Sequence, residues 1–364
     1  VETAILAEVN HQSLVATKTA RIVKAAEGKA VSDFGARRAH NMDAAVYGAR
    51  ASYIGGAAGT ATVLAGQMFG IPVSGTMAHS WVMYYKDEYE AFRHYAENYP
   101  DNTVLLVDTY DTIKSGIPNA IRVAREVLEP MGKRLKGIRI DSGDLAYQSI
   151  KVRKMLDDAG LTDCKIIVSN SLDEHTISSL NMQKARIDGY GVGERLITGA
   201  SSDYSEDSIS LLGAVYKIAA VEENGGFAPR IKVSGSVEKI TNPGLKKVYR
   251  VYDQNGKAKA DLIAKADETI DMSQEFRFVD PDMPWRNLKF THCTVRPLQE
   301  KIFENGKLVY KLPTLNEIRA YVKKQLDEEI WEEEQRFVNP HKHYMDMTPD
   351  YYDMKMSLLN DSRA

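Results

Sequence analysis

The sequence predicts an α/β protein whose first part contains parallel strands and whose second part contains mostly antiparallel strands. Between residues 1 and 220, segments with strand and helix patterns alternate along the chain. Repeated strand-then-helix units imply parallel strands joined by right-handed crossovers, and a long series of such units favours a barrel over an open sheet. From residue 221 to 364 the helical pattern gives way to strand pairs with short turns, among them Asn255-Gly256.

Each element of the first part is predicted from the spacing of its apolar residues. The predicted helices cover residues 5–22, 42–53, 60–69, 81–99, 117–131 and 146–161. The predicted strands cover residues 29–34, 72–74, 103–107, 135–140, 165–168 and 187–190.

The second part is predicted to contain two antiparallel pairs and one acidic helix. Strands 246–252 and 258–263 form a hairpin, and strands 292–295 and 308–312 form a second pair around Asn305-Gly306. The segment 314–337 has a helical pattern with a run of acidic residues, which is most simply a solvated face. The sequence therefore predicts two domains, 1–220 and 221–364.

Composition and charge exclude several classes of protein. The chain is 43% hydrophobic and 27% charged, as is ordinary for a globular protein, and its net charge of −3 gives no support for nucleic acid as a partner. No apolar run is long enough to span a membrane, and no secretory signal is present. Cys164 and Cys293 form no metal-binding or disulfide pattern, which fits the reducing cytoplasm.

Polar residues follow nearly every predicted strand of the first part. The carboxyl ends of parallel strands are where α/β proteins bind ligands, so these residues predict one shared site. They are Asp33, His79, Asp108, Asp141, Asn170 and Glu194.

The most informative segment is 135–144, because Arg139, Asp141 and Asp144 lie close together at the end of a predicted strand. One guanidinium and two carboxylates suit an anionic substrate together with a sugar or a magnesium ion. The alternative is an internal Arg–Asp pair that only stabilises the strand end.

His79 follows the Gly75-Thr76 turn where a predicted strand meets a helix, a setting that binds anions. A neutral imidazole there suits a base, a ligand or a nucleophile, and Asp108 is available to orient its ring. A lone histidine is nevertheless more often structural.

Three further segments carry weaker signals. The glycines Gly191 and Gly193 follow a strand and suit backbone contact with phosphate, although the segment is neither a P-loop nor a dinucleotide fingerprint. Phe34 is either a core residue or a stacking face for a flat ring, and Arg37 beside it suits a phosphate. A loop with several lysines that includes Ser236 and Pro243-Gly244 is most simply solvated.

Taken together, these segments resemble the family of nicotinate and nicotinamide phosphoribosyltransferases over essentially the whole chain. The resemblance continues through Lys217 to the lysine-rich loop that ends at Gly244. The motifs that carry it are Ser32-Asp33-Phe34-Gly35-Ala36-Arg37-Arg38, Gly75-Thr76-Met77-Ala78-His79, Asp108-Thr109-Tyr110-Asp111, Arg139-Ile140-Asp141-Ser142-Gly143-Asp144, Val168-Ser169-Asn170 and Gly191-Val192-Gly193.

The resemblance implies an irregular α/β barrel with a flanking, mostly antiparallel α+β domain, in a cytoplasmic homodimer. It implies that nicotinate and phosphoribosyl diphosphate react to give nicotinate mononucleotide and pyrophosphate, with Mg2+ as cofactor and with hydrolysis of ATP as co-substrate through a phosphohistidine. Two alternative functions remain compatible with the sequence: a nicotinamide-using enzyme, and a non-catalytic phosphate-binding protein. Ala61 favours nicotinate, because the nicotinamide branch carries there an Asp that accepts the carboxamide N–H.

The resemblance also implies roles for individual residues. His79, Asp108 and Asp141 are implied as catalytic, with His79 phosphorylated and Asp108 orienting it; no metal ligands are assigned. Arg139 and Thr76 are implied to contact nicotinate, and Phe34 to stack near its ring. The residues implied around the phosphoribosyl group and phosphates are Arg37, Asp141, Ser142, Ser169, Asn170, Gly191, Gly193 and Glu194.

Two features depart from the family pattern. Position 194 holds Glu, where a small polar residue would be an easier neighbour for phosphate. The family has a further N-terminal segment with an aromatic that closes over the pyridine ring, whereas this sequence opens at Val1 within a helical pattern. We therefore expect this chain alone to be a poor enzyme.

Overall fold

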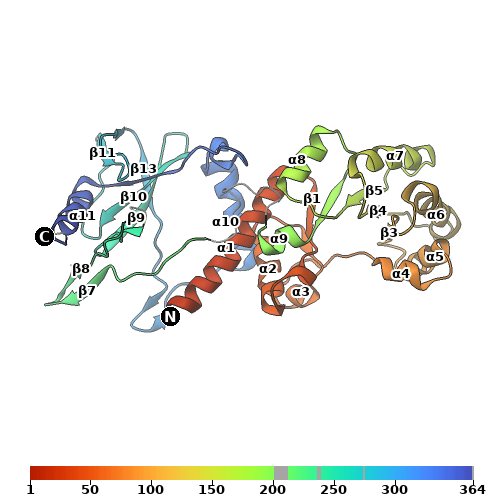
Figure 1. The fold of residues 1–364 in the computed structure, drawn as a ribbon, viewed down its shortest axis with the longest axis horizontal. Helices are drawn as coiled ribbons and strands as arrows, with labels where there is room; N and C mark the ends of the chain where they lie inside the picture. The colour runs from red at the N-terminus through yellow and green to blue at the C-terminus, as the bar shows by residue number, and fades with distance from the viewer. Residues whose placement is uncertain (201–211, 236–238, 274, 363–364) are drawn as a thin grey trace. The chain divides into compact units, whose positions relative to one another are not determined.

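The computed structural model describes residues 1–200, 212–235, 239–273 and 275–362 (Figure 1). Two compact units make up the chain, Val1–Ala214 and Val215–Ala364, here called the first and second unit. Each unit has its own sheet. Ser236 of the lysine-rich loop lies outside the described residues.

The sheet of the first unit is parallel throughout and has the strand order β2-β1-β6-β5-β4-β3. A single parallel bridge from Thr60 to Val73 extends it beyond β2. The strands therefore neighbour one another in the cyclic order of an α/β barrel. Within the described residues, no strand pairing joins Val73 to β3, so the barrel is open at that place. This curled sheet confirms the predicted irregular barrel. The strands are β1 (Ala30–Asp33), β2 (Gly59–Thr60), β3 (Val104–Leu106), β4 (Gly137–Ile140), β5 (Lys165–Val168) and β6 (Gly189–Val192).

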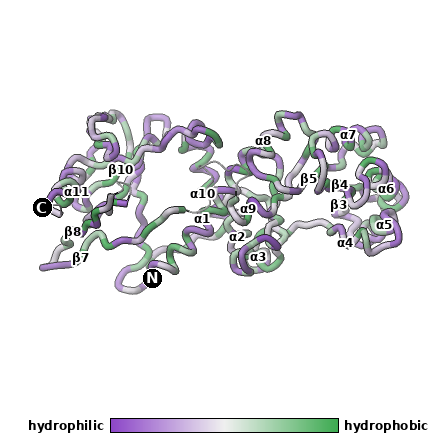
Figure 2. Tube along the Cα trace, in the orientation of Figure 1, coloured by the Kyte–Doolittle hydropathy of each residue, from purple (hydrophilic) through white to green (hydrophobic). Residues whose placement is uncertain are grey.

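Helices connect the strands of the first unit and bury one face each. α1 buries Leu14, Val15 and Ile22, and its hydropathy alternates along the helix (Figure 2). Four helices begin at a side chain that accepts a hydrogen bond from the first turn: Asn41, Asp87, Asp144 and Asp173. The helices are α1 (Glu2–Ala25), α2 (Met42–Ile54), α3 (Val63–Phe69), α4 (His79–Tyr84), α5 (Glu88–Asn98), α6 (Ile117–Val123), α7 (Leu145–Asp158), α8 (Glu174–Met182) and α9 (Glu194–Thr198).

Three predicted helices of this unit differ from the observed ones. The predicted helix 81–99 is two helices, because Tyr85 is extended and Asp87 caps a new helix by accepting from the Glu90 N–H at 2.9 Å. The predicted helix 60–69 begins only at Val63, because Thr60 pairs with β1. The predicted helix 117–131 is α-helical only to Val123 and continues as a π turn and a 3-10 turn.

The second unit contains a mixed sheet of order β12-β11-β16-β10-β9-β13. Phe278 and Phe290 pack with Val251, Leu262 and their neighbours to form its core. Its elements are β7 (Ala220–Glu223), β8 (Gly226–Pro229), β9 (Lys246–Tyr252), β10 (Ala258–Lys265), β11 (Phe276–Val279), β12 (Asn287–Phe290), β13 (Thr294–Pro297), β14 (Phe303–Glu304), β15 (Lys307–Leu308), α10 (Leu315–Lys324), β16 (Tyr344–Met347) and α11 (Pro349–Asp361).

The hairpin predicted at Asn255-Gly256 is confirmed by the antiparallel pairing of β9 and β10. The second predicted pair is wrong: β13 pairs with β9, whose long edge offers a four-residue ladder, and Asn305-Gly306 joins only β14 and β15. The single helix predicted over 314–337 is also wrong. After α10 the chain forms a π turn and becomes extended at Ile330, where the Trp331 indole N–H donates to the Ala258 carbonyl at 2.7 Å.

No helix in the described part of the chain is long and apolar enough to cross a membrane.

Candidate functional site

The three residues predicted to be catalytic meet at the carboxyl ends of β3 and β4. Asp108 follows β3, Asp141 follows β4, and His79 is the first residue of α4. The Nε2 atom of His79 lies 3.6 Å from Oδ2 of Asp141 and 3.9 Å from Oδ1 of Asp108. Residues far apart in sequence are therefore neighbours because parallel strands place their carboxyl ends at one edge of the sheet.

The imidazole of His79 is held at its other nitrogen by Thr109. Nδ1 lies 3.1 Å from Thr109 Oγ1, which leaves Nε2 facing the two carboxylates. Asp108 is engaged elsewhere: its Oδ2 accepts from the Asp141 N–H at 2.9 Å and from the Ser142 hydroxyl at 2.5 Å. The Oδ1 atom of Asp108 is buried and has no hydrogen-bond partner among the described residues.

Arg139, on β4, links side chains from three other segments of the first unit. Its Nε donates to Ser169 Oγ at 2.8 Å and one terminal nitrogen donates to Thr76 Oγ1 at 2.8 Å. The other terminal nitrogen lies 3.2 Å from Oδ1 of Asp141, which also accepts from the Ser169 hydroxyl. A guanidinium has five N–H donors, so these three contacts leave two for a ligand.

Phe34 follows β1, and its ring lies under the guanidinium of Arg139. The guanidinium carbon is 5.2 Å from the ring centroid, within the range of a cation–π contact. The backbone N–H of Phe34 donates to the Val192 carbonyl of β6 at 2.8 Å. The ring is therefore placed by the ladder between β1 and β6.

The remaining predicted substrate-binding residues follow β1, β4, β5 or β6, except Gly191, which lies within β6. Arg37, Ser142 and Asn170 are exposed, and Asn170 adopts a positive φ of 91°. Gly193 precedes α9, and the side chain of Glu194 lies 3.3 Å from that of Arg38. An acidic residue in the first turn also stabilises a helix, so Glu194 has a structural role beside any contact with phosphate.

Two strand-end carboxylates have structural roles. Asp33 is fully buried, where it accepts from the Thr60 hydroxyl at 2.7 Å and from the Gly35 N–H at 2.8 Å; burial raises the pKa of its carboxyl. Asp144 caps α7 by accepting from the Tyr147 N–H at 2.9 Å. Asp33 and Asp144 therefore shape the site without facing its centre.

Thr109 is the residue that sequence reasoning missed. A hydroxyl directly after the strand-end Asp108 was the available signal, but a hydroxyl at such a position is common in turns. Only the fold shows that Thr109 rather than Asp108 makes the hydrogen bond to the His79 ring.

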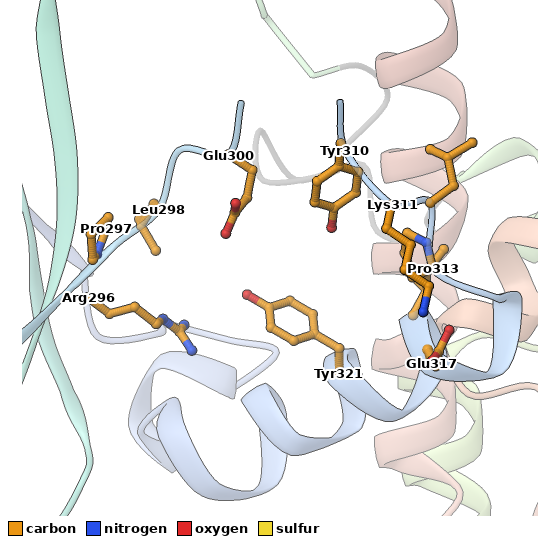
Figure 3. Close-up of a pocket in the computed structure, with 11 residues that line it drawn as sticks. Arg296, Pro297, Leu298, Glu300, Tyr310, Lys311, Pro313, Glu317 and Tyr321 are labelled. Carbon is orange, nitrogen blue, oxygen red and sulfur yellow. The ribbon is translucent and has the colours of Figure 1, made fainter. Parts of the chain in front are cut away.

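Two cavities are lined by residues other than the predicted site residues. One, of about 560 Å3, is in the first unit between α5 and α6 and includes Glu88 and Tyr110. The other, of about 630 Å3, is in the second unit, where Arg296, Glu300, Tyr310 and Tyr321 point toward one another (Figure 3). Neither cavity includes a residue that the sequence singled out as catalytic or substrate-binding.

Comparison with known proteins places these features in a family. Residues 29–266 match the model of the nicotinate phosphoribosyltransferase (NAPRTase) family, and residues 245–355 match the nicotinate phosphoribosyltransferase C-terminal domain. The chain is 47% identical to a nicotinate phosphoribosyltransferase of Bacillus subtilis over all of its own length and 72% of the relative's. It is 35% identical to one of Dictyostelium discoideum, over 99% of this chain and 68% of the relative. The crystal structure of human nicotinic acid phosphoribosyltransferase superposes with a TM-score of 0.79 at 27% identity, covering 96% of this chain and 74% of that one.

Proposed function

The chain belongs to the nicotinate phosphoribosyltransferase family, and from this premise we propose that it joins nicotinate to phosphoribosyl diphosphate, giving nicotinate mononucleotide and pyrophosphate. The observation that carries the proposal is the cluster of His79, Asp108, Asp141 and Arg139 at the strand ends of the barrel. The cluster supplies one nucleophilic nitrogen, two carboxylates and one guanidinium, which are the groups that this chemistry requires.

Nicotinate binds at Arg139 and Phe34 in this proposal. The two N–H donors that Arg139 has left receive the substrate carboxylate, and the ring of Phe34 offers an apolar face to the pyridine. Thr76 accepts a hydrogen bond from Arg139 and fixes the guanidinium plane. Holding a weak, anionic nucleophile at the sugar is much of the catalytic task.

The phosphoribosyl group lies along the neighbouring strand ends. Its hydroxyls donate to Asp141, and its phosphates lie against the loops after β1, β4, β5 and β6. Displacement of pyrophosphate at the anomeric carbon develops positive charge on the sugar, which the carboxylate of Asp141 stabilises. The residues proposed to surround this group are Arg37, Asp141, Ser142, Ser169, Asn170, Gly191, Gly193 and Glu194.

The carboxylates fit the Mg2+ that the family implies. Asp108 Oδ1 is a buried oxygen without a partner among the described residues, and Asp141 Oδ2 faces the same space. Mg2+ is commonly bound by one or two carboxylates together with substrate phosphates. Asp108 and Asp141 would hold it, and when bound it neutralises charge on the diphosphate.

ATP coupling is proposed to proceed through phosphorylation of His79. Nε2 is the ring nitrogen that faces the carboxylates, and in the tautomer whose Nδ1–H donates to Thr109 it has the free lone pair that accepts the γ-phosphoryl group. The phosphorylated side chain then favours a state of the site that binds phosphoribosyl diphosphate more tightly. Hydrolysis of the phosphohistidine returns the enzyme to its first state.

Substrate choice favours nicotinate over nicotinamide. Ala61 lies after β2 with its N–H bonded to the Asp33 carbonyl at 2.8 Å, and its methyl group offers no acceptor to a carboxamide. The absence of a carboxylate at this position also removes repulsion toward the carboxylate of nicotinate.

We further propose that the enzyme works as a cytoplasmic homodimer, as the family resemblance implies.

The test is release of pyrophosphate from phosphoribosyl diphosphate with nicotinate or nicotinamide, each with and without ATP. We expect turnover with nicotinate that ATP stimulates. Turnover only with nicotinamide would assign the chain to the other branch, and binding of phosphoribosyl diphosphate without turnover would indicate a phosphate-binding protein.

A further inference from the structure

Gly191 occupies a position of β6 where no side chain fits. A Cβ atom added there would lie 2.4 Å from Cε2 and 2.5 Å from Cδ2 of the Phe34 ring. Such distances are far below the van der Waals contact of two carbon atoms. The edge of the Phe34 ring therefore fills the space that a side chain at position 191 would take.

Further contacts hold Phe34 at its backbone and over the face of its ring. Its backbone is fixed by the hydrogen bond to Val192, and the guanidinium of Arg139 lies over the ring at 5.2 Å. Arg139 is in turn bonded to Ser169 and Thr76. A displaced ring would therefore lose part of its contact with a guanidinium that other residues hold in place.

The neighbouring glycines do not have this steric role. A Cβ at Gly189 would make an ordinary contact of 3.4 Å with the Ala30 carbonyl oxygen. A Cβ at Gly193 would lie 3.3 Å from the backbone oxygen of Phe34 and would not reach its ring. Gly191 is also not among the residues with positive φ, so its requirement for glycine is steric rather than conformational.

We propose that Gly191 is a positioning residue for the aromatic substrate: by lacking a side chain it seats the Phe34 ring under the guanidinium of Arg139, where the ring receives the pyridine and the guanidinium receives the substrate carboxylate. This inference rests on the proposed function and, for Gly191, takes the place of the phosphate contact proposed above. It makes position 191 a determinant of nicotinate affinity although residue 191 does not touch nicotinate.

The experiment compares Gly191→Ala with the wild-type chain in steady-state kinetics. We expect the KM for nicotinate to rise about tenfold, as loss of a partly desolvated cation–π arrangement implies, with the KM for phosphoribosyl diphosphate little changed. Gly189→Ala is the matched control on the same strand, and it should leave both KM values near those of the wild type.

The double variant Phe34→Ala/Gly191→Ala tests whether Gly191 acts through the Phe34 ring. With the ring removed, Gly191→Ala should add no further rise in the KM for nicotinate. A rise in the KM for phosphoribosyl diphosphate, or a full additive effect in the Phe34→Ala background, would overturn the inference and assign Gly191 to phosphate binding. Wild-type protein without nicotinate turnover would instead refute the proposed function.

Discussion

The Nδ1 atom of His79 lies 3.1 Å from the hydroxyl oxygen of Thr109, and this contact fixes which ring nitrogen faces the two carboxylates. Asp108, the residue expected to orient the ring, lies 3.9 Å from Nε2, beyond hydrogen-bond distance, and accepts from Asp141 and Ser142 instead. The hydroxyl therefore holds the ring in this orientation, and the carboxylates set the electrostatics at the other nitrogen.

Thr109→Val should weaken ATP stimulation while leaving the fold intact. Losing one neutral hydrogen bond costs about 0.5–1.5 kcal/mol, so the stimulated rate should fall by up to about tenfold. Thr109→Ser keeps the hydroxyl and should restore the rate. If Val and Ser variants behave alike in the ATP-stimulated assay, the hydroxyl does not position His79.

His79→Ala should abolish both ATP stimulation and the acid-labile label taken up from γ-phosphate-labelled ATP, because it removes the nitrogen that accepts the phosphoryl group. His94→Ala, at a half-buried histidine of α5 paired with Glu97, is the matched control and should retain the label. Labelling of the His79→Ala protein would identify another acceptor.

Arg139→Ala should raise the requirement for nicotinate far more than that for phosphoribosyl diphosphate. A charge-assisted hydrogen bond contributes about 1.5–3 kcal/mol, which corresponds to one to two decades in affinity. Arg139→Lys keeps the charge but not the planar fork and should recover only part of the loss. Equal effects on the two substrates would place Arg139 with the sugar phosphates or in a purely structural role.

Asp346 predicts a pH dependence of stability in the second unit. It is fully buried on β16, neither carboxylate oxygen has a partner in the described residues, and burial followed by the charge of Asp280 raises its pKa to about 6. The unfolded value is about 3.9, so between these values the folded state binds more protons, and the free energy of unfolding falls as pH rises.

Asp346→Asn should therefore increase the free energy of unfolding at pH 7 by about 2–3 kcal/mol and have little effect at pH 4. Urea unfolding at the two pH values measures the difference. Asp282→Asn, at an exposed carboxylate paired with Lys342, should show no comparable pH dependence. A stabilisation that is equal at both pH values would mean that ionisation of Asp346 is not its cause.

Much of the fold follows from local pattern in the sequence. When buried strands alternate with amphipathic helices, the simplest arrangement is a set of parallel strands in cyclic order. Asn255-Gly256 specifies its hairpin because these two residues readily adopt the backbone conformation of the turn. The predictions of secondary structure were wrong where a contact between residues far apart in sequence overrides a local pattern. The helical pattern of 314–337 is interrupted where Trp331 bonds to Ala258, and β13 pairs with β9 instead of with a nearby segment.

In the candidate site, too, some features follow from the sequence alone and others only from the tertiary structure. The sequence by itself determined that Asp108 and Asp141 follow strands and that His79 lies near the start of a helix, and parallel topology then requires strand ends to meet at one edge. Only the tertiary structure decided that Thr109 bonds the imidazole, that Asp33 is buried away from the centre, and that the ring of Phe34 fills the space beside Gly191. These outcomes depend on distances between side chains far apart in sequence, and packing of the whole barrel sets those distances.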